Sequence, residues 1–122
     1  MPSILLVEDD ATMLSLLIML LEMENFTVIT LPEDTPKTIL ATIQAEKPDL
    51  LLMDVNLRQA SGMEVLKMIK ANETNKGMRI LMSSGMDFRV ECLKAGADGF
   101  ILKPYMPDDL IRQIHQVLAA VR

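Results

Sequence analysis

Hydrophobic residues occur along this chain in short continuous runs, and each run ends in polar residues. A run of this kind is typical of a strand that is buried on both faces of a parallel sheet. In the clearest case, residues 50–54, four apolar residues lead to the carboxylate of Asp54. We expect five strands, at residues 4–7, 26–30, 50–54, 79–82 and 99–102.

The segments between these runs carry apolar residues at helical spacing. Asp10 can cap the first helix, Pro36 suits the first turn of the second, and Gly96 closes the fourth. We expect helices over residues 11–24, 36–45, 63–71 and 87–95, and a last helix from Pro107 onward. The inner face of this last helix carries Leu110, Ile111, Ile114, Val117, Leu118 and Val121.

Five strand-then-helix units with short loops indicate an α/β protein with a parallel, doubly wound sheet of five strands. The 122 residues suffice for one domain with a substantial core, and no linker interrupts them. We therefore expect residues 1–122 to form one domain.

The predicted helix over residues 11–24 is hydrophobic around most of its circumference, whereas an ordinary surface helix buries one apolar stripe. Either this helix is buried unusually deeply, or it offers an apolar contact surface to a partner or a second copy of the chain. The hydrophobic positions are Leu14, Leu16, Leu17, Ile18, Met19, Leu20 and Leu21.

The composition excludes several kinds of site. A formal net charge of −5 argues against direct contact with nucleic acid through a basic face. Cys92 is the only cysteine, which excludes an internal disulfide and fits a reducing compartment. His115 is the only histidine, so a Cys/His metal site is excluded as well. We expect a solvated His115 and a Cys92 in or near the core.

The apolar runs are also too short for a membrane protein. The longest, residues 13–21, is interrupted by Ser15 and falls well below the roughly 20 residues that a membrane span needs. No basic segment precedes the first apolar run, which is too short for a signal peptide. We therefore expect a soluble, cytoplasmic protein without membrane contact.

Polar residues with chemical potential follow four of the five predicted strands. Because parallel strands end at the same edge of a sheet, these residues become neighbours there. Clustered carboxylates raise one another's pKa unless a cation neutralises them, and Lys103 and a divalent metal are the candidate cations. Oxygen ligands without histidine or cysteine favour Mg²⁺. The residues are Glu8 and Asp9, Asp54, Ser83 and Lys103.

A carboxylate beside Mg²⁺ and a lysine is equipped to accept a phosphoryl group. Asp54 would attack as nucleophile, and Ser83 would hydrogen-bond a phosphoryl oxygen. Each residue also has a purely structural explanation, as a helix cap, a surface charge or a turn residue. Their joint occurrence at four strand ends favours the chemical interpretation.

Four segments, residues 4–10, 51–57, 80–85 and 95–104, resemble the receiver domain of two-component response regulators, in order and at the family's spacing. The resemblance implies a flavodoxin-like, CheY-like (βα)₅ fold with strand order 2-1-3-4-5. It also implies that Asp54 accepts a phosphoryl group from a phosphohistidine on a sensor kinase or phosphotransfer protein. Such a domain is not an enzyme beyond catalysing its own phosphorylation and slow autodephosphorylation.

The resemblance assigns a role to each site residue. Asp9, Asp54 and the backbone carbonyl of Asn56 would ligate Mg²⁺, and Glu8 would act through a water molecule. Lys103 would pair with the carboxylate and then with the phosphoryl group.

Further roles concern the phosphoryl group and the switch. Ser83 and the amide of Ser84 would contact phosphoryl oxygens, and Phe100 would move inward together with Ser83. The Lys103–Pro104 bond would be cis, as is usual in this family.

The chain departs from the family's pattern at several positions. Glu8 replaces the more common aspartate and has a longer arm. Arg58 replaces a common proline, so we expect a less rigid loop after Asp54. Gly99 and Gln113 replace the aspartate and arginine of the salt-bridged dimer face in winged-helix regulators, which argues against that dimer. Gly85 offers no side chain to orient a hydrolytic water, so we expect a long-lived phosphoaspartate.

Other proteins of related chemistry or topology fit less well. A haloacid-dehalogenase-like phosphatase needs a second aspartate two residues after the nucleophile, where Asn56 cannot transfer a proton. A flavin-binding flavodoxin would need a phosphate loop where Glu8, Asp9 and Asp10 would repel the phosphate. A receiver that is not phosphorylated would lack Asp9, Asp54 or Lys103, and all three are present.

The output surface is expected on the fourth helix, fifth strand and fifth helix, because Ser83 and Phe100 adjoin them. A homodimer through the first helix or through this face is also compatible with the pattern.

Overall fold

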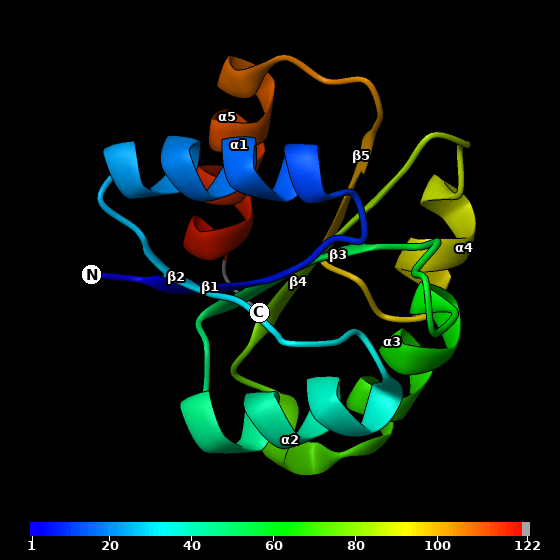
Figure 1. Ribbon diagram of the computed structural model, residues 1–122. Coiled ribbons are helices and arrows are strands. Elements are labelled where there is room, and N and C mark those ends of the chain that lie inside the picture. Colours follow the sequence, from blue (N-terminus) through cyan, green and yellow to red (C-terminus); the bar gives the residue numbers. More distant parts are fainter. Residues whose placement is uncertain (121–122) are drawn as a thin grey trace.

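A parallel sheet of five strands forms the centre of the protein in the computed structural model, which describes residues 1–120 (Figure 1). The strand order is β2-β1-β3-β4-β5, and every neighbouring pair is parallel, so the predicted fold and strand order are confirmed. The strands are β1 (Ser3–Val7), β2 (Thr27–Ile29), β3 (Leu50–Asp54), β4 (Arg79–Ser84) and β5 (Gly99–Leu102).

Five α-helices cover both faces of this sheet. Figure 1 shows α1 and α5 on one face and α2, α3 and α4 on the other. None of the helices within residues 1–120 is long and apolar enough to cross a membrane. The helices are α1 (Ala11–Met23), α2 (Pro36–Glu46), α3 (Gly62–Ala71), α4 (Arg89–Lys94) and α5 (Pro107–Ala119), with a 3₁₀ turn, η1 (Glu73–Asn75).

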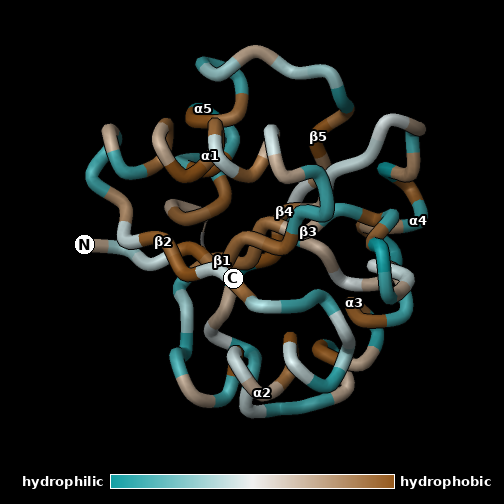
Figure 2. The backbone as a smooth tube through the Cα atoms, viewed as in Figure 1, coloured by the Kyte–Doolittle hydropathy of each residue, from teal (hydrophilic) through white to brown (hydrophobic). Residues whose placement is uncertain are grey.

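The core has two layers, one on each face of the sheet. Successive side chains of a strand point to opposite faces. In β3, Leu50 and Leu52 accordingly pack toward α1 and α5, whereas Leu51 and Met53 pack toward α2, α3 and α4. Figure 2 shows the strands as the most hydrophobic part of the backbone trace. Burial on both faces explains why β3 is a continuous apolar run.

Side chains cap the starts of α1, α2 and α3. The Asp10 carboxylate accepts a 3.0 Å hydrogen bond from the Met13 amide, as predicted for the start of α1. Pro36 is in the first turn of α2, where Thr35 is the N-cap, and Ser61 is the N-cap of α3. These caps satisfy amides that a helix start leaves without partners.

Several boundaries differ from the predicted ones. Strand β4 includes Ser83 and Ser84, because both residues pair with β5. Helix α4 begins at Arg89 rather than at residue 87, because the Asp87 carboxylate accepts a hydrogen bond from the Arg89 amide ahead of the helix. The loop predicted at residues 72–77 contains η1, and β2 is shorter than residues 26–30. Val121, predicted on the inner face of the last helix, is outside the described residues.

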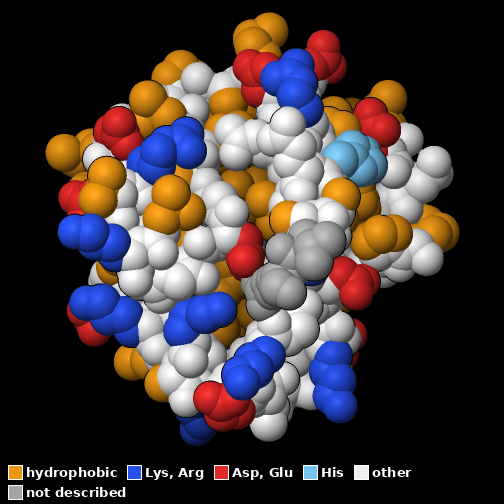
Figure 3. All heavy atoms as spheres, turned by 180° about the vertical axis from the view of Figure 1, so that it is seen from behind, with side chains coloured by type: hydrophobic (Ala, Val, Ile, Leu, Met, Phe, Trp, Pro, Cys, Tyr) orange, Lys and Arg blue, Asp and Glu red, His pale blue; other side chains and the backbone are white. Residues whose placement is uncertain are grey.

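Helix α1 buries one stripe and exposes another. Leu17 and Leu21 are buried, whereas Leu16, Met19 and Met23 are 58%, 62% and 75% exposed. The structure therefore does not bury this helix on all sides, which leaves an apolar strip on its outer surface. On the opposite side of the molecule from the view of Figure 1, charged side chains of both signs are mixed with hydrophobic ones (Figure 3).

Candidate functional site

Asp54 is the last residue of β3, at the carboxyl edge of the sheet, and only 7% of it is exposed. It is in register with Ser83 of β4, and the Val55 amide donates a 2.8 Å hydrogen bond to the Ser83 carbonyl. Gly62 supports this position from the other side. Its amide donates to the Val55 carbonyl at 2.7 Å, and a Cβ on Gly62 would collide with the Asp54 carbonyl oxygen. The backbone around the carboxylate is thus held on both sides.

Three carboxylates meet at this edge. One oxygen each of Glu8, Asp9 and Asp54 lie within 4.8 Å of one another. Glu8 and Asp9 follow β1, which pairs directly with β3, so the parallel sheet brings residues 8 and 54 together. The proximity expected from the sequence is therefore present.

Lys103 follows β5 and reaches two of the three acids. Its ammonium is 2.8 Å from Glu8 Oε1 and 2.8 Å from Asp54 Oδ2. Its amide donates a 2.8 Å hydrogen bond to the Ser84 carbonyl, which extends the pairing of β4 and β5. The contact with Asp54 was expected, whereas the contact with Glu8 was not. The peptide bond to Pro104 is cis, as the resemblance implied.

The ion pairs hold Lys103 in its charged form. Burial works to lower the pKa of the Lys103 ammonium, but the hydrogen bonds to Asp54 and Glu8 outweigh burial and keep that pKa above its ordinary value. At neutral pH this residue therefore provides a fixed positive charge beside Asp54.

For the pKa of the Glu8 carboxyl, in contrast, burial outweighs the hydrogen bond from Lys103. Burial raises the pKa of the Glu8 carboxyl above its ordinary value, and the negative charge of Asp54 adds to this increase. The hydrogen bond from Lys103 opposes both effects without cancelling them. We expected repulsion between the acids to raise their pKa values, and for the Glu8 carboxyl the loss of solvent is the larger cause.

The remaining carboxylate atoms are available for a metal ion. Asp54 Oδ1 accepts a 3.2 Å hydrogen bond from the amide of Asn56, while Asp54 Oδ2 contacts Lys103. Within residues 1–120 the Asp9 carboxylate makes no hydrogen bond or ion pair. Three close carboxylates that offer only oxygen atoms match the ligand preference of a hard divalent cation. The donor set therefore fits Mg²⁺.

The residues expected to respond to phosphorylation are in β4 and β5. Ser83 is buried next to Asp54 in the sheet, and the Ser84 hydroxyl accepts a 3.1 Å hydrogen bond from the Met86 amide. Phe100 lies in the core, 1% exposed, beneath the guanidinium of Arg89. The Arg89 contact was not predicted, because nothing in the sequence indicates which face of α4 this side chain covers.

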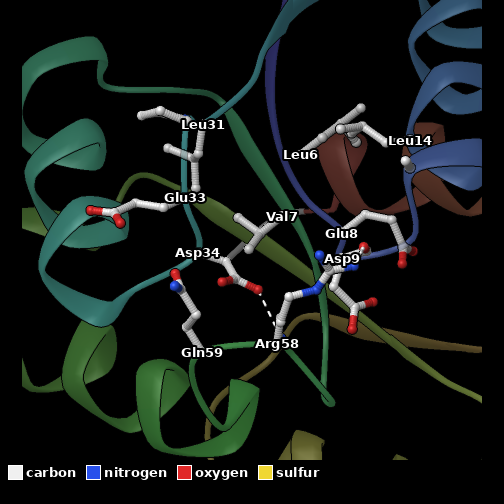
Figure 4. A pocket seen from close by; sticks show the side chains of 12 residues that line it. Leu6, Val7, Glu8, Asp9, Leu14, Leu31, Glu33, Asp34, Arg58 and Gln59 are labelled. Atoms are coloured by element: carbon white, nitrogen blue, oxygen red, sulfur yellow. Dashed lines mark hydrogen bonds between the residues drawn. The ribbon is translucent and has the colours of Figure 1, made fainter.

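A cavity of about 400 Å³ opens beside the acidic cluster (Figure 4). Apolar side chains of β1, α1 and the loop after β2 form one part of its wall, and Arg58 closes the other. The Arg58 amide donates to Asp34 Oδ2, and its guanidinium donates to the Asp9 carbonyl, each at 2.9 Å. From the departure from proline at Arg58 we expected only a less rigid loop, and these contacts were not predicted.

The single histidine and the single cysteine of the chain, His115 and Cys92, are outside the site. His115 is exposed on α5, as predicted, with its ring 5.6 Å from that of Phe26. Cys92 is fully buried on α4, as predicted, with its sulfur 3.6 Å from the Met63 sulfur.

The chain is similar in sequence to a known family. The family described as "Response regulator receiver domain" matches residues 4–115. The cell cycle transcriptional regulator CtrA of Caulobacter vibrioides is 34% identical over 116 residues, which cover 94% of this chain and 49% of that protein. The chain spans about half the length of the curated relatives it matches.

Solved structures agree with this similarity. A putative response regulator from Chloroflexus aurantiacus is 27% identical, with a TM-score of 0.88, over 98% of this chain and 100% of that one. A CheY-like response regulator receiver domain protein from Methanospirillum hungatei is 34% identical, with a TM-score of 0.83, over 97% of this chain and 94% of that one. The likeness thus covers nearly the whole length in fold as well as in sequence.

Proposed function

Because the chain belongs to the response regulator receiver domain family, we propose that Asp54 accepts a phosphoryl group from a phosphohistidine on a sensor kinase or phosphotransfer protein. Residues 1–122 would act as one receiver domain and would catalyse only their own phosphorylation and slow autodephosphorylation. The single observation that carries the proposal is the contact of Lys103 with a buried Asp54 beside two further acids.

The transfer follows from the positions of these groups. A carboxylate oxygen of Asp54 forms a bond to phosphorus, the bond from phosphorus to the imidazole nitrogen breaks, and the nitrogen keeps the electron pair. The Lys103 ammonium, already 2.8 Å from Asp54, offsets charge on the phosphoryl oxygens as the group arrives. Ser83 and the Ser84 amide are the hydrogen-bond donors for those oxygens on the β4 side.

The acidic cluster would hold Mg²⁺. Asp9, Asp54 and the Asn56 carbonyl are the direct ligands in this proposal, and Glu8 acts through water. When bound, the ion neutralises charge on the transferring phosphoryl group.

Phosphorylation would be read out on the surface of α4, β5 and α5. Ser83 and Phe100 lead from the acceptor to that surface, and they would move together when the phosphoryl group arrives. Partners could bind there or on the apolar strip of α1, and a homodimer through either surface is included in the proposal. We propose a cytoplasmic domain without direct nucleic-acid or membrane contact. Exposed apolar residues on the α4-β5-α5 side are Met86, Val90, Leu93, Leu102 and Met106.

The test is the intact mass of the protein after incubation with acetyl phosphate and Mg²⁺. The wild-type chain should gain one phosphoryl group, and D54N, which has nearly the same shape but lacks the anionic nucleophile, should gain none. D108N on α5 is the matched control, because it removes an aspartate charge outside the Glu8–Asp9–Asp54 cluster and should still be modified. Identical spectra for wild type and D54N would disprove the proposal.

A further inference from the structure

Arg58 connects three loops at the carboxyl edge of the sheet. It is in the loop between β3 and α3, its amide donates to Asp34 before α2, and its Nη2 donates to the Asp9 carbonyl after β1. Figure 4 shows its side chain extended from its own loop toward Asp9. This conformation holds a guanidinium charge next to the acidic cluster.

The charges in the cluster are unevenly compensated. Lys103 contacts Glu8 and Asp54 at 2.8 Å, but within the described chain it makes no such contact with Asp9. The Arg58 guanidinium is bonded to the backbone of Asp9 rather than to its carboxylate. It therefore acts on the Asp9 carboxylate, and on any cation bound there, through space and partly through solvent.

We propose that Arg58 is a tethered cation that weakens the binding of a divalent metal ion to the Glu8–Asp9–Asp54 cluster. The inference depends on the proposed function, because it assumes that the cluster binds Mg²⁺. In the metal-free protein the guanidinium is held beside Asp9 by its hydrogen bond to the Asp9 carbonyl. A bound dication would bring two further positive charges close to the same guanidinium, and the repulsion lowers the metal affinity.

A second effect of Arg58 has the opposite sign. By linking the loops that carry Asp9 and Asn56, its hydrogen bonds pre-order two of the proposed ligands, and pre-ordering strengthens binding. The two effects respond differently to ionic strength. Repulsion between exposed charges is screened by salt, whereas the ordering of loops by hydrogen bonds is much less affected. We infer that repulsion dominates at low salt because Mg²⁺ carries a double charge.

The experiment is a Mg²⁺ titration, followed by calorimetry and by backbone amide shifts in NMR spectra, at low and at high ionic strength. R58Q should bind Mg²⁺ about threefold to tenfold more tightly than wild type at low salt, and the difference should shrink in about 1 M salt. R58K keeps the charge and should remain near wild type. R112Q lowers the net charge by the same unit but is on α5, so it should also bind like wild type.

Each contrary result has a distinct meaning. Equal or weaker Mg²⁺ binding by R58Q than by wild type would overturn the inference and leave the phosphoacceptor proposal intact. An equal gain in Mg²⁺ affinity by R112Q would also overturn the inference, because the net charge of the protein would then explain the tighter binding. If the wild-type chain bound no Mg²⁺, the inference and the metal part of the proposed function would both fail, and the Asp54 mass experiment would still test the acceptor.

Discussion

The guanidinium of Arg89 lies over the ring of Phe100, 5.8 Å from its centroid, and donates a 3.2 Å hydrogen bond to the Phe100 carbonyl. Arg89 is also the first residue of α4, a helix without a side-chain cap. A single side chain therefore attaches the start of this short helix to β5. It does so at the aromatic residue that we expect to take part in switching.

Replacing Arg89 with alanine should loosen the attachment of the start of α4 to β5. We expect a loss of about 1 kcal/mol in the free energy of unfolding, because a partly exposed cation–π contact and a hydrogen bond disappear together. Urea denaturation measures the loss, and amide exchange should show faster opening of α4. R112A removes only a surface ion pair with Asp109 and should cost less than about 0.5 kcal/mol. Equal losses in the two variants would contradict the proposed attachment.

Replacing Lys103 with methionine should destabilise the protein most at neutral pH. Two nearly buried carboxylates, Glu8 and Asp54, would lose their common cation, at a cost of about 2 kcal/mol at pH 7. The pKa of Glu8 is already raised above its ordinary 4.5, so ionisation of Glu8 costs stability as the pH rises. Without Lys103 this cost grows, so the part of the difference from wild type that comes from Glu8 should shrink as acid protonates that carboxyl.

Urea denaturation at several pH values measures that difference. K94M, which removes an exposed lysine of α4, is the control and should follow wild type at each pH. A K103M deficit that stays constant down to acidic pH would show that packing, and not charge, is responsible. K103M should also accept phosphoryl groups from acetyl phosphate far more slowly.

Cys92 should be unreactive in the folded protein. Burial, helped by the charge of Glu91, raises the pKa of its thiol from 9.0 to about 11, and the side chain is fully buried. A thiol reagent such as DTNB should therefore label native protein at least about 100-fold more slowly than urea-unfolded protein. Rapid labelling of the native chain would contradict the burial of this residue.

The same thiol should make the protein less stable in alkali. Between pH 9 and 11 the unfolded chain ionises Cys92 first, so stability falls with rising pH by at most about 1.4 kcal/mol per pH unit from this group. C92A has a lower baseline stability but should lack this part of the slope. Parallel slopes for wild type and C92A would mean that the thiol does not titrate differently in the two states.

Gly85 should set the lifetime of the phosphorylated form. A Cβ at this position would meet no atom within 4 Å, so larger side chains fit there. An amide side chain could orient a hydrolytic water, and G85N should shorten the lifetime of phosphoaspartate by at least about tenfold. The loss of the phosphoryl mass with time measures this lifetime. G85A fills the same space without a polar group and should decay like wild type, whereas equal decay of G85N would refute the expectation.

The fold and the composition of the acidic cluster could be predicted because both depend on simple periodicities. Continuous apolar runs mark strands that are buried on two faces, and parallel strands must end at one edge. The sequence order of Asp9, Asp54 and Lys103 then suffices to place them together without any knowledge of loop shape. Their chemical roles remain predictions.

Other features could not be predicted because long side chains reach across loops. Arg58 and Arg89 bond to backbone carbonyls 49 and 11 residues away, and no periodicity specifies such partners. Lys103 bridges Glu8 and Asp54 because the assembled sheet brings the ends of β1 and β3 within reach of its ammonium. Ser83 and Ser84 extend β4 because β5 pairs with them, although serine itself favours turns.

The close contact of Gly62 with the Asp54 carbonyl has a consequence for how this sequence can change. Every other amino acid would push the start of α3 away from the sheet, because its Cβ would overlap the Asp54 and Val55 backbone. Gly77 and Gly85, where an added Cβ meets no atom within 4 Å, accept side chains freely. In a library of variants, residue 62 would thus tolerate no substitution, whereas residues 77 and 85 would vary. The lack of substitution at residue 62 would then reveal its contact with the end of β3, where the proposed acceptor lies, without any assay of phosphorylation.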